Sequence, residues 1–172
     1  MAKNLATRID VPYLSVNSLV RREKLHHGYD RKVSSYILDQ NRVSRRIGSI
    51  LSNTHGAIFD TNYVQGIIPR KRNSIAIVLR LDPVILYNRL RRRGWNKRKC
   101  WENAEAELVD STLIDTINSL GNRRVFQIDT THRSQAELEK IAMKIINGKM
   151  EKSDRIDWLA KYDPIKLQRR FS

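Results

Sequence analysis

Apolar residues occur along the chain in short runs, separated by longer stretches in which they recur every three or four positions. Short apolar runs are typical of buried strands, and the three-to-four spacing is typical of helices that bury one face. The alternation predicts an α/β fold built from parallel βα units. We expect strands over 12–15, 57–60, 74–81 and 124–128, and helices over 2–9, 17–24, 40–52, 82–93, 97–120, 134–147 and 154–161.

Local signals mark where some of these elements begin and end. The run SIAIVLRL at 74–81 is the clearest buried strand, and Asp82 followed by Pro83 opens the next helix in the favoured order. Gly94 ends that helix. We expect the polar stretch 26–32, which contains Gly28, to be a loop.

Two further helices have candidate N-caps. Asp39 precedes 40–52, a segment with Val43 and Ile47 on one face. For the helix over 17–24, either Asn17 or Ser15 can serve as the cap.

The composition predicts one folded domain over residues 1–172. The chain has a mass of 20.1 kDa, with 40% hydrophobic and 30% charged residues, which allows a sizeable core. No apolar run approaches the roughly 20 residues that cross a bilayer, and the start lacks the apolar stretch of a secretory signal. The single cysteine, Cys100, excludes an intramolecular disulfide and a cysteine-built zinc site. We therefore expect a cytoplasmic protein with no membrane partner.

Charge is the unusual property of the sequence. Lys and Arg number 33 against 18 Asp and Glu, which gives a net charge of +15 and a pI near 10.4. Such an excess attracts phosphate-rich partners, namely RNA, DNA or nucleotides. The alternative is an evenly solvated basic surface without a specific partner.

Five cations are crowded together directly after the strand–helix unit over 74–93. They are Arg89, Arg91, Arg92, Arg93 and Lys97. Because like charges repel, such a cluster needs either an anion or wide exposure to water. The planar guanidinium suits bidentate binding of phosphate, so the cluster is either a phosphate site or a solvated basic face.

Asp60 ends a short apolar strand, at the sheet edge where open α/β folds bind ligands. A carboxylate there can order Mg²⁺ or its water shell beside a nucleotide, although Asp60-Thr61-Asn62 also has the composition of a turn. Arg21, on the helix after the first strand, could contact an acceptor phosphate.

Other candidates are less specific. Tyr29, Trp95 and Trp101 could stack on a base, although Trp101 could equally be a core residue. His26 and His27 lack a third metal ligand nearby.

Taken in order, nine short segments resemble a known family, the small adenylate-kinase-like enzymes of archaea and eukaryotes linked to late maturation of the small ribosomal subunit. The resemblance covers nearly the whole chain. The segments are 16–21 (VNSLVR), 28–30 (GYD), 36–39 (YILD), 58–60 (IFD), 75–80 (IAIVLR), 86–90 (LYNRL), 93–96 (RGWN), 103–107 (NAEAE) and 157–159 (DWL).

The resemblance implies a P-loop-kinase-like three-layer sandwich and a role for several residues. Residues 15–38 would bind the nucleoside monophosphate, and 92–102 would form a lid over ATP. Asp60 would be the catalytic carboxylate that holds Mg²⁺ through its bound water. The implied monophosphate-binding residues are Arg21, Tyr29 and Asp30, and the implied lid residues are Arg92, Arg93, Asn96 and Lys97, with Arg93 on the donor phosphates.

Two departures from the family pattern limit what the resemblance implies. The family has a histidine where this chain has Asn62, and that histidine is tied to ATP hydrolysis. Asparagine cannot carry a proton near neutral pH, so hydrolysis is in particular doubt.

The second departure concerns the phosphate loop. The family opens with a strand and a Gly-x-x-x-x-Gly-Lys-Thr loop, and none of the seven glycines here is followed by Lys-Ser or Lys-Thr. We therefore expect a sheet without its first strand and Walker A loop, with unpaired edges on the neighbouring strands. A start assigned too far downstream, a degenerate relative, or a second chain that supplies the strand would each explain this.

The resemblance implies Mg²⁺-dependent transfer of a phosphoryl group from ATP to AMP or a related monophosphate. Its implied partners are a small-subunit ribosomal protein and rRNA. The alternative is a non-catalytic, basic ribosome-assembly or RNA-binding factor on a degenerate kinase fold. A DNA-binding domain is a more distant alternative, because no helix-turn-helix or zinc signature is present.

Overall fold

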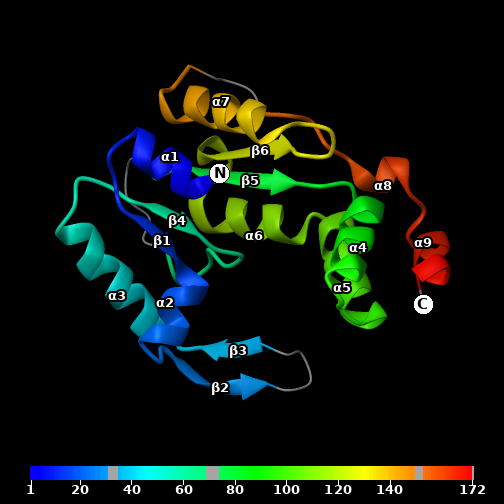
Figure 1. The fold of residues 1–172 in the computed structure, drawn as a ribbon, viewed down its shortest axis with the longest axis horizontal. Coiled ribbons are helices and arrows are strands. Elements are labelled where there is room, and N and C mark those ends of the chain that lie inside the picture. The colour runs from blue at the N-terminus through cyan, green and yellow to red at the C-terminus, as the bar shows by residue number, and fades with distance from the viewer. Residues whose placement is uncertain (31–34, 69–73, 150–152, 172) are drawn as a thin grey trace.

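The computed structural model describes residues 1–30, 35–68, 74–149 and 153–171 (Figure 1). The predicted parallel α/β arrangement is confirmed, because two pairs of strands that are connected through helices run parallel. The strands are β1 (Tyr13–Ser15) with β4 (Ile58–Asp60), β5 (Ala76–Arg80) with β6 (Val125–Asp129), and an antiparallel hairpin of β2 (His26–Asp30) and β3 (Ser35–Leu38).

The predicted loop over 26–32 is wrong, since residues 26–30 form strand β2 of the hairpin. The strand is held by cross-strand aromatic contacts: the ring of Tyr36 lies 4.3 Å from that of His26 and 5.1 Å from that of Tyr29. Such pairs stabilise a two-stranded ribbon, but they join two strands, and the polar residues at 26–30 give no apolar signal for the first of them. Residues 31–34 of the expected monophosphate-binding segment lie outside the described residues.

Most of the predicted helices are present within one or two residues of their expected ends. Ser15, and not Asn17, caps the second helix, and Asp39 and Asp82 cap the third and fourth as expected. The helices are α1 (Ala2–Arg8), α2 (Val16–Arg22), α3 (Gln40–Ser52), α4 (Pro83–Arg92), α5 (Lys97–Leu108), α6 (Ser111–Leu120), α7 (Gln135–Ile146), α8 (Trp158–Lys161) and α9 (Pro164–Phe171). Among the described residues, no helix is long and apolar enough to span a membrane.

The single helix predicted over 97–120 is wrong, because the chain breaks between α5 and α6. Asp110 adopts a left-handed backbone conformation with φ of 58°, which aspartate tolerates better than most residues. Its carboxylate pairs with Arg80. The break lets α5 pack beside α4 while α6 packs against β5.

The C-terminal part also differs from the prediction over 154–161. Only Trp158–Lys161 is helical, because the carboxylate of Asp154 accepts the backbone N–H of Asp129 at 2.9 Å and also pairs with Arg133. These bonds hold the chain extended beside β6. Helix α9 was not predicted.

Three clusters of buried apolar residues lie within the described part of the chain. One fills the space around α2 and α3, one lies between β5 and α6, and one joins α4, α5, α8 and α9, which we call the α4–α5 cluster. The members of the α4–α5 cluster are Tyr87, Leu90, Cys100, Ala104, Leu108, Trp158, Leu167 and Phe171. In Figure 1, α7 and α6 lie on opposite sides of the β5–β6 pair.

The two parallel pairs do not form one continuous sheet among the described residues. Ile58 donates its N–H to Pro12 beside β1, and Arg80 accepts from Thr130 beside β6. The N–H and C=O groups of successive residues point to alternate sides of a strand. Those of Phe59 therefore point away from β1, and those of Ile77 and Leu79 point away from β6, towards edges where no described strand pairs. Leu79 remains 45% exposed, although strands of parallel sheets are normally covered.

Candidate functional site

The end of the β1–β4 pair places Asp60 beside the start of α2. Ser15, the register partner of Asp60, caps α2 by accepting the N–H of Ser18 at 3.4 Å. Tyr13 donates its hydroxyl to Oδ2 of Asp60 at 2.9 Å, and this hydrogen bond raises the pKa of Tyr13. The carboxylate is exposed, and Oδ1 has no hydrogen bond to a described residue. Asp60 is therefore open to a solvated cation.

Arg21 lies on the last turn of α2 and is exposed. Its guanidinium has no ion pair or hydrogen bond among the described residues. The neighbouring Arg22 differs, because it lies 3.5 Å from Glu23, a carboxylate that also binds Arg46 at 2.8 Å. Arg21 is thus the cation on this helix that is available to an anion.

The β2–β3 hairpin carries the other residues expected to bind a monophosphate. Tyr29 is 52% exposed and meets Tyr36 edge to face, which leaves ring surface open to solvent. Asp30 ends β2 and is half-buried. In the described part of the chain, no group of three or more His, Cys, Asp or Glu could hold a metal ion, His26 and His27 included.

The connection between α4 and α5 follows a run of three arginines. Arg91 donates to the carbonyl of Trp95 at 2.5 Å, and the ammonium of Lys99 lies 4.7 Å from the ring centre of Trp95. Arg92 and Arg93 are exposed and have no side-chain partner among the described residues. The loop thus presents two unpaired guanidinium groups.

The other two predicted lid residues have structural contacts. Asn96 caps α5, with its side-chain oxygen accepting the N–H of Lys99 at 2.8 Å. Lys97 interacts within the protein. Trp101 packs against the α4–α5 cluster, with its ring 6.0 Å from that of Phe171.

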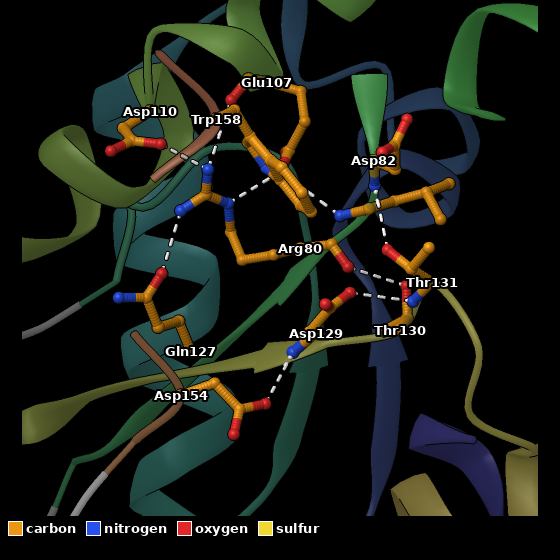
Figure 2. A network of polar contacts seen from close by, with 11 residues as sticks. Arg80, Asp82, Glu107, Asp110, Gln127, Asp129, Thr130, Thr131, Asp154 and Trp158 are labelled. Carbon is orange, nitrogen blue, oxygen red and sulfur yellow. Dashed lines mark hydrogen bonds and ion pairs between the residues drawn. The ribbon is translucent and has the colours of Figure 1, made fainter. Parts of the chain in front are cut away.

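Figure 2 shows a buried polar network that the sequence analysis missed. Arg80 is only 1% exposed. It donates from Nε to Glu107 at 2.7 Å and from Nη1 to Gln127 at 2.9 Å, and it pairs with Asp110. Burial raises the pKa of Glu107, and this effect outweighs the positive charge of Arg80, which acts to lower it. The only signal in the sequence was a charged residue inside an otherwise apolar strand.

A second buried carboxylate, Asp82, lies at the start of α4. Its Oδ1 accepts the N–H groups of Val84 and Ile85, and its Oδ2 accepts Lys161 Nζ at 2.7 Å and the Tyr162 hydroxyl at 2.6 Å. Burial alone would raise the pKa of Asp82. The hydrogen bonds from Lys161 and Tyr162 outweigh that effect, and the pKa is lowered.

Asp154 is expected to make stability depend on acid pH. The hydrogen bond from Arg133 lowers the pKa of Asp154 in the folded protein. The stabilisation that the ionised Asp154 provides is therefore complete above its pKa in the unfolded chain, about 3.9. It is lost as the pH falls through its lower pKa in the folded protein. Asp154→Asn should flatten the decline in unfolding free energy between about pH 5 and pH 3, measured by urea denaturation.

The matched control is Asp115→Asn, which removes an exposed carboxylate that has no side-chain partner among the described residues. The control should leave the decline unchanged. A decline that is equally steep in wild type and Asp154→Asn would contradict the assigned role of the Arg133–Asp154 pair.

The comparisons with known proteins identify the class. A family described as AAA domain matches residues 1–110. A protein of Saccharolobus solfataricus named "Putative adenylate kinase" is 32% identical over 158 residues, which are 92% of this chain and 79% of the relative. Relatives with the same printed name occur in Thermococcus onnurineus (30% over 167 residues, 96% and 87%) and Methanocaldococcus jannaschii (28% over 162 residues, 94% and 86%).

The fold and these matches define an α/β protein of the P-loop NTPase class. Within that class, the chain belongs to the adenylate-kinase-like family of these relatives.

The predicted site residues fall on two parts of the molecule. Arg21 and Asp60 belong to the β1–β4 side, whereas Arg92 and Arg93 stand at the far end of α4. In Figure 1, the β2–β3 hairpin and the α4–α5 pair both extend towards the lower part of the view. Arg21 and Asp60 thus lie on a different part of the fold from Arg92 and Arg93.

Proposed function

We propose that the protein transfers a phosphoryl group from ATP to AMP or a related nucleoside monophosphate. Family membership supports the reaction class. The observation that carries the proposal is a pair of exposed cationic sites, Arg21 on α2 and Arg92 with Arg93 at the end of α4, whose guanidinium groups have no partner among the described residues. An unpaired, exposed guanidinium is suited to bidentate phosphate binding.

In this proposal the residues act by positioning and by charge neutralisation, with no covalent intermediate. Arg21 holds the acceptor phosphate, and the exposed ring of Tyr29 packs on the acceptor base, with Asp30 beside it. Arg92 and Arg93 neutralise negative charge on the donor phosphates as the lid closes.

Asp60 fits a role beside Mg²⁺. Its exposed carboxylate, with Oδ1 free of hydrogen bonds to described residues, suits a contact through metal-bound water. When bound with ATP, Mg²⁺ would neutralise phosphate charge. Tyr13 orients the carboxylate through the opposite oxygen, Oδ2.

The proposal includes a phosphate cradle from outside the 172 residues. No glycine of the chain is followed by Lys-Ser or Lys-Thr, and among the described residues no strand pairs with the edges of β4 and β5 that would flank a central strand. We therefore expect the 172-residue chain by itself to lack micromolar affinity for ATP. We also expect slow ATP hydrolysis, because Asn62 cannot act as a proton donor or base.

A role in maturation of the small ribosomal subunit, in the cytoplasm and with rRNA and a ribosomal protein as partners, belongs to the same proposal. The net charge of +15 favours it. The same charge also favours the second candidate, a non-catalytic assembly factor. That candidate requires RNA affinity that falls steeply with salt and needs no nucleotide.

Arg21→Ala is expected to weaken AMP binding by the 172-residue chain at least about tenfold, because it removes a charge-assisted phosphate contact. Isothermal titration calorimetry with AMP measures the change. Arg22→Ala is the control: it removes an adjacent arginine that already pairs with Glu23, so AMP affinity should change little. Equal losses in the two variants, or no AMP binding by wild type, would contradict the acceptor site.

A further inference from the structure

Helices α4 and α5 form a hairpin, defined here as residues 83–108, and we call the two helices its legs. A buried carboxylate lies at the base of each leg, which is the start of α4 and the end of α5. Asp82 caps the first turn of α4, and Glu107 lies on the last turn of α5. Their side chains are 3% and 14% exposed. The opposite end of the hairpin carries Arg92 and Arg93, so any change in its tilt at the base moves these guanidinium groups.

One short segment of the chain hydrogen-bonds to both carboxylates. At the start of α8, Trp158 donates its indole N–H to Glu107 Oε1 at 2.9 Å, as Figure 2 shows. At its end, Lys161 Nζ and the Tyr162 hydroxyl donate to Asp82 Oδ2 at 2.7 and 2.6 Å. Residues 158–162 therefore bridge the two legs of the hairpin.

The C-terminal helix extends the same contact along the hairpin. The ring of Phe171 stacks on Tyr87 of α4 with centroids 3.9 Å apart, and the Tyr87 hydroxyl donates to the Phe171 carbonyl at 3.1 Å. All members of the α4–α5 cluster come from α4, α5, α8 and α9. The hairpin thus shares its core with the C-terminal segment and not with the other two clusters.

The contact of Lys161 with Asp82 can open without exposing the core. The Lys161 side chain is 53% exposed, whereas that of Asp82 is 3% exposed. Asp82 retains the Tyr162 hydroxyl and two backbone N–H groups when Lys161 leaves. Removal of the lysine charge therefore loosens the bridge and leaves no buried carboxylate without a donor.

We propose that residues 158–162 are a positioning element for the α4–α5 hairpin. Trp158, Lys161 and Tyr162 fix the tilt of the two legs and so determine where Arg92 and Arg93 stand. The link to donor phosphates rests on the proposed function, whereas the restraint on the hairpin does not.

The test is Lys161→Met, which keeps the apolar stem and removes the charge. Hydrogen–deuterium exchange should quicken about tenfold in α4 and α5 and stay unchanged in α3 and α7, because only the bridge is weakened. Lys140→Met, at an exposed lysine of α7 without a partner among the described residues, is the matched control and should change neither region. Unchanged exchange in the hairpin, or faster exchange throughout the chain, would overturn the proposal.

The second readout is steady-state kinetics of the protein from its natural host carrying the same substitution. A positioning role predicts about a fivefold higher KM for ATP with the KM for AMP unchanged. Equal changes in both constants, or none, would overturn the link to the donor site. If no ADP forms even in wild type, the proposed function fails, and the exchange measurement still decides the restraint.

Discussion

Arg80→Ala is expected to lower the free energy of unfolding by about 3–5 kcal/mol, which is the usual cost of leaving a buried charge without its partner. The guanidinium is 1% exposed and supplies Glu107 with its closest donor, at 2.7 Å. In its absence Glu107 keeps the N–H groups of Leu81 and Trp158, but no cation. Urea denaturation of both proteins at pH 7 measures the difference.

Arg98→Ala is the control for this experiment. Arg98 forms an exposed pair with Glu102 one turn along α5 at 2.8 Å, and such pairs contribute about 0–1 kcal/mol. The double variant Arg80→Met with Glu107→Gln should be more stable than Arg80→Ala, because the more deeply buried of the two carboxylates that pair with Arg80 is then uncharged. A loss for Arg80→Ala no larger than that for Arg98→Ala would contradict the buried network of Figure 2.

Arg93→Ala is expected to lower the rate of ADP formation by about 10²–10³-fold, the usual effect of removing one group that stabilises transition-state charge. The relevant protein is the one produced in its natural host, assayed with ATP, AMP and Mg²⁺. The control is Arg89→Ala, since Arg89 is also exposed on α4 and has no side-chain partner among the described residues. Its activity should stay within about threefold of wild type, because Arg89 lies one turn before the loop. Intact activity in Arg93→Ala would contradict the lid assignment.

Elements with strong local signals could be predicted from the sequence. Helix α3 begins and ends where expected, because Asp39 supplies a capping carboxylate and Val43 and Ile47 repeat at helical spacing. The strand within 74–81 was predictable from its apolar run, and Asp82 with Pro83 marks the following helix.

Elements that depend on contacts with another element of the fold could not be predicted. Strand β2 is built from polar residues and depends on Tyr36 across the hairpin. The break before α6 contains neither glycine nor proline; it accompanies the pairing of Asp110 with Arg80, 30 residues away in sequence. Helix α9 likewise depends on packing of Phe171 against Tyr87.

The candidate site shows the same division. The position of Asp60 at the end of a strand followed from the apolar pattern, and its location in the structure agrees. The hydrogen bond from Tyr13 and the burial of Arg80 needed the tertiary structure. The roles of Arg21, Tyr29 and Arg93 in nucleotide binding stay predictions.

The most direct test of the proposed phosphoryl transfer is a measurement of ADP formation from ATP and AMP by the protein purified from its natural source, in the presence of Mg²⁺. The account predicts ADP formation that requires AMP, with two ADP formed for each AMP consumed. Absence of AMP-dependent ADP formation, together with RNA binding that needs no nucleotide and weakens steeply with salt, would contradict it and identify a non-catalytic basic assembly factor.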